Sequence, residues 1–308
     1  MTHTGLLFVL VGPSGTGKNS IITALLKEGN PGNLRQLTTV TTRPKRENET
    51  EGKEHYFVSE PRFQELIESG ALIEHQLIHK EFYYGAPHEG VKKAIDSGED
   101  LIADIDVLGA KALKAAYPEN VILIFIAPPD SRVLEERIRS RESETEEAIR
   151  TRLERAAMER TYVPECDYLV VNDDLAHAVQ LVKDIVVAYQ HDLHVEDHAG
   201  FFAHAWVAEP AGILTVDEKL PFAPVTKREN AIASLKAHLA EQNILVEDVN
   251  GHAAGVWYHH QHGQPVVDMI IPMQAVRIPE HSQWRPAETI VLPSYIKELL
   301  GDLRPTFE

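Results

Sequence analysis

One glycine-rich segment constrains the fold more than any other feature of this 308-residue chain. The apolar run Leu6–Val11 leads directly into Gly12-Pro-Ser-Gly-Thr-Gly-Lys-Asn19, and a helical apolar pattern covers Asn19–Glu28. This order of strand, loop and helix matches the phosphate-binding pattern G-x-x-x-x-G-K up to its last position. Glycines let successive backbone amides point inward, and the helix N-terminus and Lys18 add positive charge for a polyphosphate. We therefore predict a nucleotide phosphate site at this loop.

The position after Lys18 departs from the usual pattern. A serine or threonine hydroxyl normally meets Mg²⁺ there, whereas this chain has Asn19, followed by Ser20. An amide oxygen is an acceptable ligand for a hard cation, so Asn19 is a candidate metal ligand. Alternatively, the metal contact runs through water or another side chain. We expect nucleotide binding to survive either arrangement.

Strand and helix patterns alternate over the first 190 residues. Such alternation predicts an α/β fold with a parallel sheet covered on both faces. The predicted strands are Leu6–Val11, Asp100–Ile105, Val121–Ala127 and Tyr168–Val171. The predicted helices are Asn19–Glu28, Pro61–Ser69, Val91–Ser97, Ser131–Ser140, Thr145–Arg160 and Leu175–Tyr189.

The composition limits the kinds of partner. With 30 basic and 47 acidic residues, the chain has a net charge of −17, which disfavours nucleic-acid binding over a broad basic face. Cys166 is the only cysteine, so an internal disulfide is excluded and a reducing cytosol is indicated. No signal peptide is evident, and no apolar run approaches the ~18 residues of a membrane helix. We expect a cytoplasmic protein without nucleic-acid or membrane partners.

Several motifs follow the loop in a defined order. They are Thr38–Arg46 with three cations, Gly52–Val58, Ala71–Glu74, Phe82–Pro87, Asp104-Ile-Asp106, and an arginine-rich stretch over 137–155. In order and spacing, these segments resemble the guanylate kinase family over about residues 4–190. The resemblance implies a P-loop kinase with a parallel sheet core, an NMP-binding subdomain and a lid subdomain. It also implies phosphoryl transfer from ATP to GMP, and to dGMP, with Mg²⁺ accompanying ATP.

The resemblance assigns the GMP site residue by residue. Arg43 and Arg46 match the two arginines that grip the GMP phosphate, because forked guanidinium groups suit a dianion. Tyr84 matches a phenol on that phosphate, and Glu74 matches the carboxylate that accepts from guanine N1–H and N2–H₂. Asp104 matches an aspartate near the base. The complete predicted GMP set is Thr39, Arg43, Arg46, His55, Tyr56, Glu74, Tyr84 and Asp104.

This chain departs from the family at three GMP positions. Thr39 replaces a serine and keeps the hydroxyl, whereas Ala86 loses a hydroxyl that would contact guanine O6. The loop from Arg46 to Gly52 is about one residue longer than usual. The second phosphate-binding tyrosine therefore corresponds to His55 by register or to Tyr56 by residue type, and both stay open.

The resemblance also assigns the ATP site. Arg141 and Arg152 match the lid arginines that, with Lys18, neutralise the transferring phosphoryl group. Arg137 and Asn172 match residues on the adenine side. Asp106 lies two residues beyond Asp104, on the same predicted strand face, where it could orient metal-bound water. The predicted ATP-binding residues are Gly12, Pro13, Ser14, Gly15, Thr16, Gly17, Lys18, Asn19, Ser20, Arg137 and Asn172, and the predicted metal ligands are Asn19 and Asp106.

Two other functions are compatible with parts of the pattern. A related P-loop kinase could phosphorylate another phosphorylated small molecule such as a ribose bisphosphate, which Asn19 and Ala86 favour slightly. A non-catalytic guanylate-kinase-like interaction module is the third reading. Such modules tend to lose the loop lysine and lid arginines, whereas Lys18, Arg141 and Arg152 are present here. The sequence leaves a homodimer open.

A change in composition marks a second predicted domain. Ten of the 16 histidines lie after residue 190, and the polar stretch 191–200 separates residues 1–190 from 200–308. The second part is predicted to be a smaller α+β appendage, loosely similar to a Nudix domain. Its predicted elements are the strands Phe201–Glu209, Gly212–Asp217 and Ile244–Val249, a hairpin of Ala254–His260 with Val266–Pro272, and a final short helix Pro293–Leu300. Its predicted helix Lys227–Gln242 carries only Glu229 and Glu241, too few for that family's metal chemistry. The cluster of His259, His260 and His262 indicates a solvated hairpin tip rather than a metal site.

Overall fold

We describe the chain from a computed structural model. The residues described are 4–27, 29–47, 49–78, 81–140, 145–197, 199–209, 212–215, 220–225, 227–242, 244–248, 253, 255–261, 263–277, 283–285, 292 and 296. The chain forms two compact units, which are 1–12 with 17–124, and 13–16 with 125–308. This division does not coincide with the sequence boundary near 190–200, which stays a prediction.

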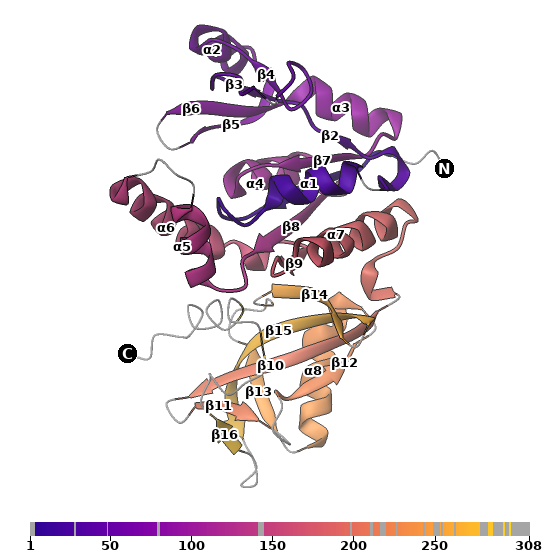
Figure 1. Cartoon of the computed structure of the whole chain (residues 1–308). Coiled ribbons are helices and arrows are strands. Elements are labelled where there is room, and N and C mark those ends of the chain that lie inside the picture. The colour runs from indigo at the N-terminus through magenta and orange to yellow at the C-terminus, as the bar shows by residue number, and fades with distance from the viewer. Residues whose placement is uncertain are drawn as a thin grey trace. The chain divides into compact units, whose positions relative to one another are not determined.

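The first unit contains a parallel sheet that carries the loop of the phosphate-binding motif. Its strand order is β2 (Arg35–Gln36), β7 (Leu101–Asp104), β1 (Leu7–Val11) and β8 (Val121–Ala127), which continues into the second unit. β1 pairs with β7 in parallel from Leu7 opposite Leu101 to Leu10 opposite Asp104. The helices of this unit are α1 (Lys18–Lys27), α2 (Glu60–Glu68), α3 (His88–Ser97) and α4 (Val107–Ala116), with a 3₁₀ turn at Pro31–Asn33. The predicted α/β class is confirmed (Figure 1).

A second, four-stranded sheet lies in the same unit. Its order is β4 (His55–Phe57), β3 (Thr39–Thr41), β6 (Phe82–Pro87) and β5 (Leu72–Ile78). β3 runs parallel to β4 and antiparallel to β6, so the side chains of three distant motifs meet on one sheet. The apolar periodicity does not predict these strands, because β3 and β4 have only three residues each and β4 and β6 carry several half-exposed positions.

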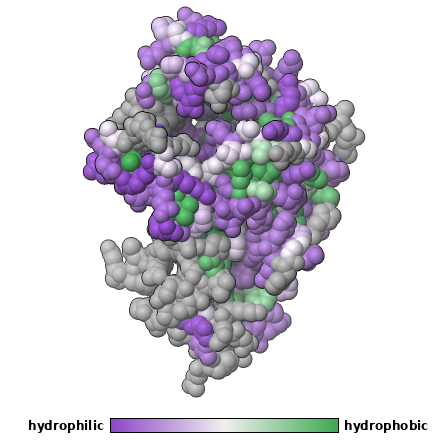
Figure 2. Space-filling view, viewed as in Figure 1, coloured by the Kyte–Doolittle hydropathy of each residue, from purple (hydrophilic) through white to green (hydrophobic). Residues whose placement is uncertain are grey.

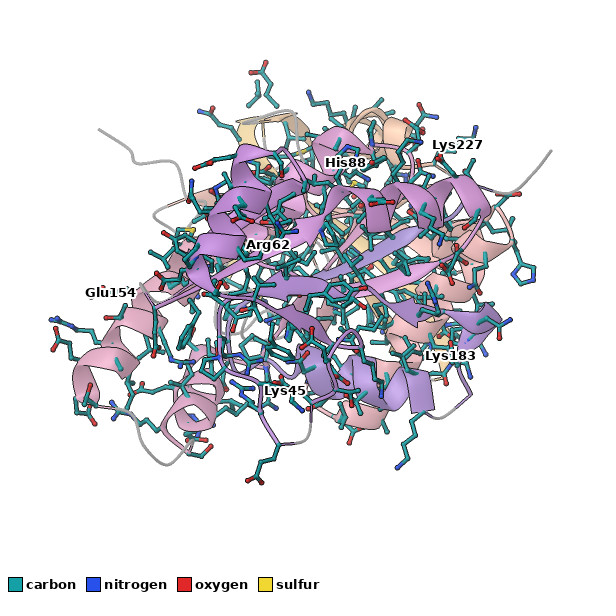
Figure 3. The ribbon with its side chains drawn as sticks, turned by 90° about the horizontal axis from the view of Figure 1, so that it is seen from above. Lys45, Arg62, His88, Glu154, Lys183 and Lys227 are labelled. Atoms are coloured by element: carbon teal, nitrogen blue, oxygen red, sulfur yellow. The ribbon has the colours of Figure 1, made fainter. Side chains whose placement is uncertain are left out.

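The second unit begins with the remaining elements of the predicted kinase part. These are α5 (Ser131–Arg139), α6 (Glu146–Arg160), β9 (Tyr168–Val171), α7 (Leu175–Gln190) and the 3₁₀ turns Val163–Glu165 and Val195–Asp197. The pairing of α5 with α6 buries Leu134, Ile138, Ile149 and Ala156. Their outer faces carry ion pairs, as the charge pattern predicts. One example is Arg150 with Glu154, and Figure 3 labels Glu154.

The sheet of the second unit continues past β9 into the C-terminal part. Its order after β9 is β14 (Gly255–Gln261), β15 (Gln264–Arg277), β10 (Gly200–Glu209), β11 (Gly212–Thr215) and β16 (Gln283–Arg285). β12 (Phe222–Pro224) pairs with β10, β13 (Leu245–Asp248) pairs with β15, and α8 (Ala231–Glu241) follows the 3₁₀ turn Arg228–Asn230. β14 runs parallel to β9, with Trp257 opposite Leu169. The C-terminal part therefore extends the sheet at β9.

The predicted C-terminal elements are largely confirmed. The hairpin is β14 with β15, and the helix predicted over Lys227–Gln242 is shorter because its first residues form the 3₁₀ turn. The final helix predicted over Pro293–Leu300 and the residue His262 lie outside the described residues, apart from Ile296. The predicted solvated histidine tip is wrong for His259, which is half-buried and bonds Asp268 at 2.8 Å. It is also wrong for His260, which lies 3.5 Å from Asp184.

The described surface is mostly polar. Figure 2 shows hydrophilic side chains over most of the coloured face, with small scattered hydrophobic groups. Among the described helices, none combines the length and the hydrophobicity needed to cross a membrane. Exposed large apolar side chains such as Leu77, Leu108 and Val276 come from separate elements.

An ion pair between the half-buried Arg228 and the well-covered Glu196 side chain joins the C-terminal part to β9 within the second unit. Arg228 pairs with Glu196, donates to the Asp167 carbonyl at 2.7 Å and lies 4.4 Å above the Tyr168 ring. The Tyr168 hydroxyl in turn donates to Glu196 at 2.8 Å. Removal of one partner from such a pair leaves the other charge buried without compensation.

We predict that Arg228→Met lowers the free energy of unfolding by about 3–5 kcal/mol, because Glu196 loses its counter-ion. Chemical denaturation followed by circular dichroism measures the change. The neighbouring exposed Lys227, labelled in Figure 3, provides the matched control Lys227→Met, for which we expect less than about 0.5 kcal/mol. Equal effects of the two substitutions would contradict the structural role of this pair.

Candidate active site

Backbone conformation shapes the phosphate-binding loop between β1 and α1. Gly12, Gly15 and Gly17 have φ values of 123°, 94° and 92°, which residues with a side chain rarely adopt. Lys18 begins α1 and folds back over the loop, where its Nζ donates to the Gly12 carbonyl at 2.6 Å. The same Nζ lies 3.5 Å from Asp104 Oδ1 at the end of β7. Lys18 is thus held by internal acceptors at the place where the motif predicts phosphate.

Asn172, directly after β9, fixes the phosphate-binding loop by a hydrogen bond. Its side-chain amide donates to the Thr16 carbonyl at 2.7 Å, and its backbone N–H donates to Ala127 at 2.8 Å. Thr16 is fully buried and donates its hydroxyl to the Pro13 carbonyl at 3.0 Å. Arg137 donates to the Asn172 carbonyl at 3.2 Å. The two residues predicted on the adenine side therefore contact each other, and Asn172 also supports the loop backbone.

The predicted lid approaches the loop within the second unit. Arg152 on α6 donates to Ser14 Oγ at 3.0 Å. A Cβ at Gly15 would lie 3.4 Å from side-chain atoms of Leu134 and Ile138 on α5. Arg141, the other predicted lid arginine, lies outside the described residues.

The predicted phosphate arginine Arg43 follows β3 and is almost completely engaged. Its Nε donates to the Tyr84 hydroxyl at 3.0 Å, and its Nη1 donates to the Pro44 carbonyl at 2.7 Å. Its two terminal nitrogens also donate to the two carboxylate oxygens of Glu49, at 3.0 and 2.7 Å. Arg43 lowers the pKa of Glu49 to about 2, although burial opposes this. The sequence analysis did not single out Glu49, because its contact with Arg43 depends on how the loop after Arg46 folds back.

The geometry distinguishes the two candidates on β4. His55 Nδ1 lies 2.7 Å from Thr39 Oγ1, and the His55 ring centroid lies 5.9 Å from that of Tyr84. Tyr56 alternates to the other side of the strand and is 44% exposed. Burial, together with the positive charge of Arg43, lowers the pKa of His55. His55, rather than Tyr56, therefore shares the cluster of Arg43 and Tyr84, whereas Arg46 is exposed at its edge.

Glu74 on β5 is a buried carboxylate. Only 9% of its surface is exposed, and the backbone N–H of Ala86 donates to its side chain. Burial, followed by the nearby negative charge of Asp106, raises the pKa of Glu74 to about 7. A Cβ at Gly109 would lie 2.5 Å from Glu74 Oε2, so this glycine gives the carboxylate its space. Sequence analysis did not single out Gly109.

Asp104 and Asp106 occupy different local structures. Asp104 ends β7 beside Lys18; burial raises its pKa and Lys18 opposes this effect. The prediction that Asp106 shares its strand face is wrong, because β7 has ended and Asp106 is the N-cap of α4. The Asp106 carboxylate accepts from the backbone N–H groups of Leu108 and Gly109, both at 2.9 Å. This cap brings Asp106 and Gly109 to the same helix end, next to Glu74.

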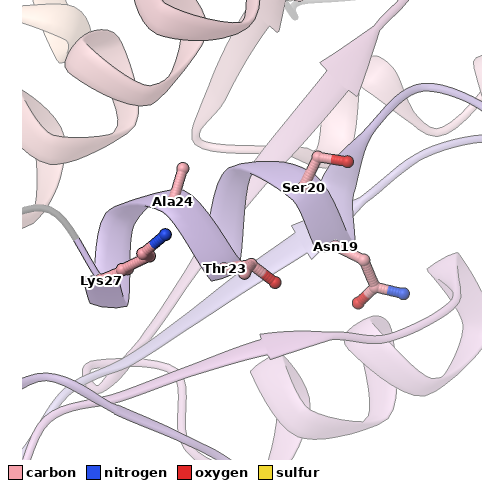
Figure 4. A pocket seen from close by; sticks show the side chains of 5 residues that line it. All are labelled: Asn19, Ser20, Thr23, Ala24 and Lys27. Atoms are coloured by element: carbon pink, nitrogen blue, oxygen red, sulfur yellow. The ribbon is translucent and has the colours of Figure 1, made fainter. Parts of the chain in front are cut away.

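The described residues suit a cation that takes most of its ligands from water and substrate phosphates rather than from protein side chains. Within the described part of the chain, no group of three His, Cys, Asp or Glu side chains could enclose a metal ion. Asn19 lies at the start of α1 and lines a shallow pocket with Ser20, Thr23, Ala24 and Lys27 (Figure 4). Mg²⁺ commonly binds through one or two protein ligands, water and substrate phosphates. One amide oxygen here fits that mode.

Comparison with known proteins gives the family. The guanylate kinase family model matches residues 5–189. The guanylate kinase of Rickettsia felis is 41% identical over 186 residues, which cover 60% of this chain and 95% of that protein. That of Clostridium acetobutylicum is 40% identical over 188 residues, or 61% and 88% of the two chains. A guanylate kinase structure from Anaplasma phagocytophilum has 30% identity and a TM-score of 0.49, covering 62% of this chain and 88% of that one. This chain belongs to the guanylate kinase family.

Proposed function

We propose that this chain catalyses ATP + GMP → ADP + GDP with two subsites built from the residues described above. The observation that carries the proposal is the small sheet of the first unit. It presents Arg43 with Tyr84 for a phosphate and the buried Glu74 for a base edge. A carboxylate there accepts from guanine N1–H and N2–H₂, whereas adenine offers a different donor pattern. This pairing of groups favours GMP over a phosphorylated sugar.

The acceptor phosphate already carries negative charge, so the reaction needs no strong general base. Catalysis then consists of alignment in line with the γ-phosphoryl group and neutralisation of its developing charge. Lys18, Arg141 and Arg152 are proposed to supply that charge. Arg43, Arg46, Tyr84 and His55 are proposed to aim the attacking oxygen. The 2.6 Å hydrogen bond from Lys18 Nζ to the Gly12 carbonyl supports this role of Lys18, because it already holds the cation at the loop.

Asn19 is the proposed protein ligand of Mg²⁺, and Asp106 is proposed to orient metal-bound water. The ion held there would supply positive charge against the ATP phosphates. The finer expectations stay proposals as well. They are the use of dGMP, a cytoplasmic location, a homodimer, the independence from nucleic acid and membranes, and an appended α+β domain over residues 200–308.

We predict that Lys18→Ala reduces kcat by at least about 10²–10³-fold, because the γ-phosphoryl group loses a positioned cation. A coupled ADP-release assay with GMP measures turnover, and circular dichroism checks the fold. The exposed Lys92 on α3 gives the control Lys92→Ala, which should retain normal turnover. Normal activity in Lys18→Ala would remove the phosphate-binding loop from the mechanism.

The raised pKa of Glu74 predicts a pH dependence of GMP use. A protonated carboxyl cannot accept both guanine N–H groups, so kcat/KM for GMP should fall as pH decreases through about 7 and level off above it. The pH profile of kcat/KM for GMP, measured with saturating ATP, tests this. In Glu74→Gln the overall value should be low and this titration should vanish. The same titration in wild type and Glu74→Gln would assign it to another group.

We predict that Gly109→Ala lowers kcat/KM for GMP by about 10–100-fold, because the new methyl group displaces the Glu74 carboxylate. The KM for ATP should change less than about twofold. Gly90→Ala on α3 is the matched control, since a Cβ there meets only Pro87 at 3.4 Å. Equal losses toward GMP and ATP in Gly109→Ala would indicate a general folding defect instead.

A further inference from the structure

The guanidinium group of Arg43 has few donors left for a substrate. Of its five N–H bonds, one serves Tyr84, one serves Pro44 and two serve Glu49. Both partners of the ion pair are well covered, with 10% and 11% of their side-chain surfaces exposed. A phosphate that binds this arginine through two parallel bonds must therefore replace an existing partner.

The Glu49 carboxylate binds the Arg43 guanidinium group as the oxygens of a phosphate ligand would. Its Oε1 and Oε2 accept from the two terminal nitrogens of Arg43, in the fork geometry that guanidinium also offers to phosphate. Its Oε2 accepts in addition from the backbone N–H of Arg46 at 2.9 Å. The residue thus takes up donors of both predicted phosphate-binding arginines. Lys45, labelled in Figure 3, fixes the backbone of the same residue by donating to its carbonyl at 3.1 Å.

We propose that Glu49 is an internal counter-anion that fills the phosphate subsite of the acceptor and that the phosphate of GMP displaces it. The inference rests on the proposed role of Arg43 at that phosphate. Tyr84 accepts from the guanidinium group, His55 lies beside Tyr84, and Thr39 contacts His55. Glu49 is the carboxylate that binds Arg43 in this cluster, so it is the anion that a phosphate would have to replace.

Displacement makes the charge of the acceptor a criterion of selection. A phosphate monoester carries about −1.5 to −2 at pH 7, so it offers Arg43 more charge than the single carboxylate that leaves. A ligand with a singly charged group, or with none, gains nothing from the exchange. Glu49 is therefore a specificity-determining residue: it reduces the apparent affinity for every acceptor in proportion to the occupied fraction of the subsite. Strong dianions overcome this penalty best.

The test compares GMP with guanosine in the full chain. Glu49→Gln removes the competing charge, so the dissociation constant of GMP, measured by calorimetry, should decrease by about tenfold. Guanosine has no phosphate and does not require the displacement, so its dissociation constant should stay within twofold. The KM for GMP should decrease in parallel, whereas the KM for ATP should not change.

Glu47→Gln is the matched control, because it removes the same charge from an exposed position of the same loop. Its affinities should equal those of wild type. Glu49→Ala serves as a second variant, and thermal unfolding verifies that both Glu49 variants are folded. A weaker or unchanged affinity of folded Glu49→Gln for GMP would overturn the proposal and make Glu49 a positioning residue of Arg43. An equal gain in affinity for guanosine and for GMP would overturn it likewise, because guanosine has no phosphate that could displace Glu49.

Three results separate a failure of the proposed function, of the proposed role of Arg43 and of the counter-anion proposal. If wild type does not phosphorylate GMP, the proposed function fails whatever Glu49 does. If wild type phosphorylates GMP but Arg43→Lys leaves its KM unchanged, the proposed role of Arg43 fails. The counter-anion proposal alone fails when both of those results are as expected and Glu49→Gln gives no gain.

Discussion

Positive charge placed for phosphate must be balanced before the phosphate arrives, and this constraint recurs through the site. Lys18 lies between the Gly12 carbonyl and Asp104, Arg43 is clamped by Glu49, and Arg152 donates to Ser14. The chain has a net charge of −17, so acidic residues outnumber the cations with which they can pair. Each internal acceptor fixes the orientation of its cation, and each weakens the first contact with substrate. In the proposed function, substrate binding would exchange these internal partners of each cation for phosphate oxygens.

The sequence was informative where the chemistry is local. The phosphate-binding loop, the strands β1, β7, β8 and β9 and the long helices could be predicted because a continuous motif or a buried apolar run marks each of them. The small sheet could not, since its three-residue strands acquire meaning only by pairing β3 with β4 and β6. The same pairing decided between His55 and Tyr56, because alternation along β4 places only His55 beside Tyr84.

The candidate site shows the same division at the level of single residues. Arg43, Glu74 and Lys18 could be proposed as site residues because they stand in segments that resemble the family's motifs. Glu49 and Gly109 could not, because their importance comes from where a loop returns and how closely a helix approaches. The predicted geometry of Asp106 is wrong, because two positions beyond Asp104 it already caps α4 and its Oδ1 accepts from two backbone N–H groups.

The base subsite combines these constraints. Gly109 allows α4 to approach Glu74, and the cap on Asp106 fixes the start of that helix, which brings a second negative charge near the buried carboxylate. Burial and that charge both penalise ionised Glu74, whereas two N–H donors of guanine would favour it. A base without those donors leaves the penalty uncompensated. In the proposed function, the cost of keeping the buried Glu74 charged would become discrimination between bases, as the displacement of Glu49 would become discrimination between acceptors by charge.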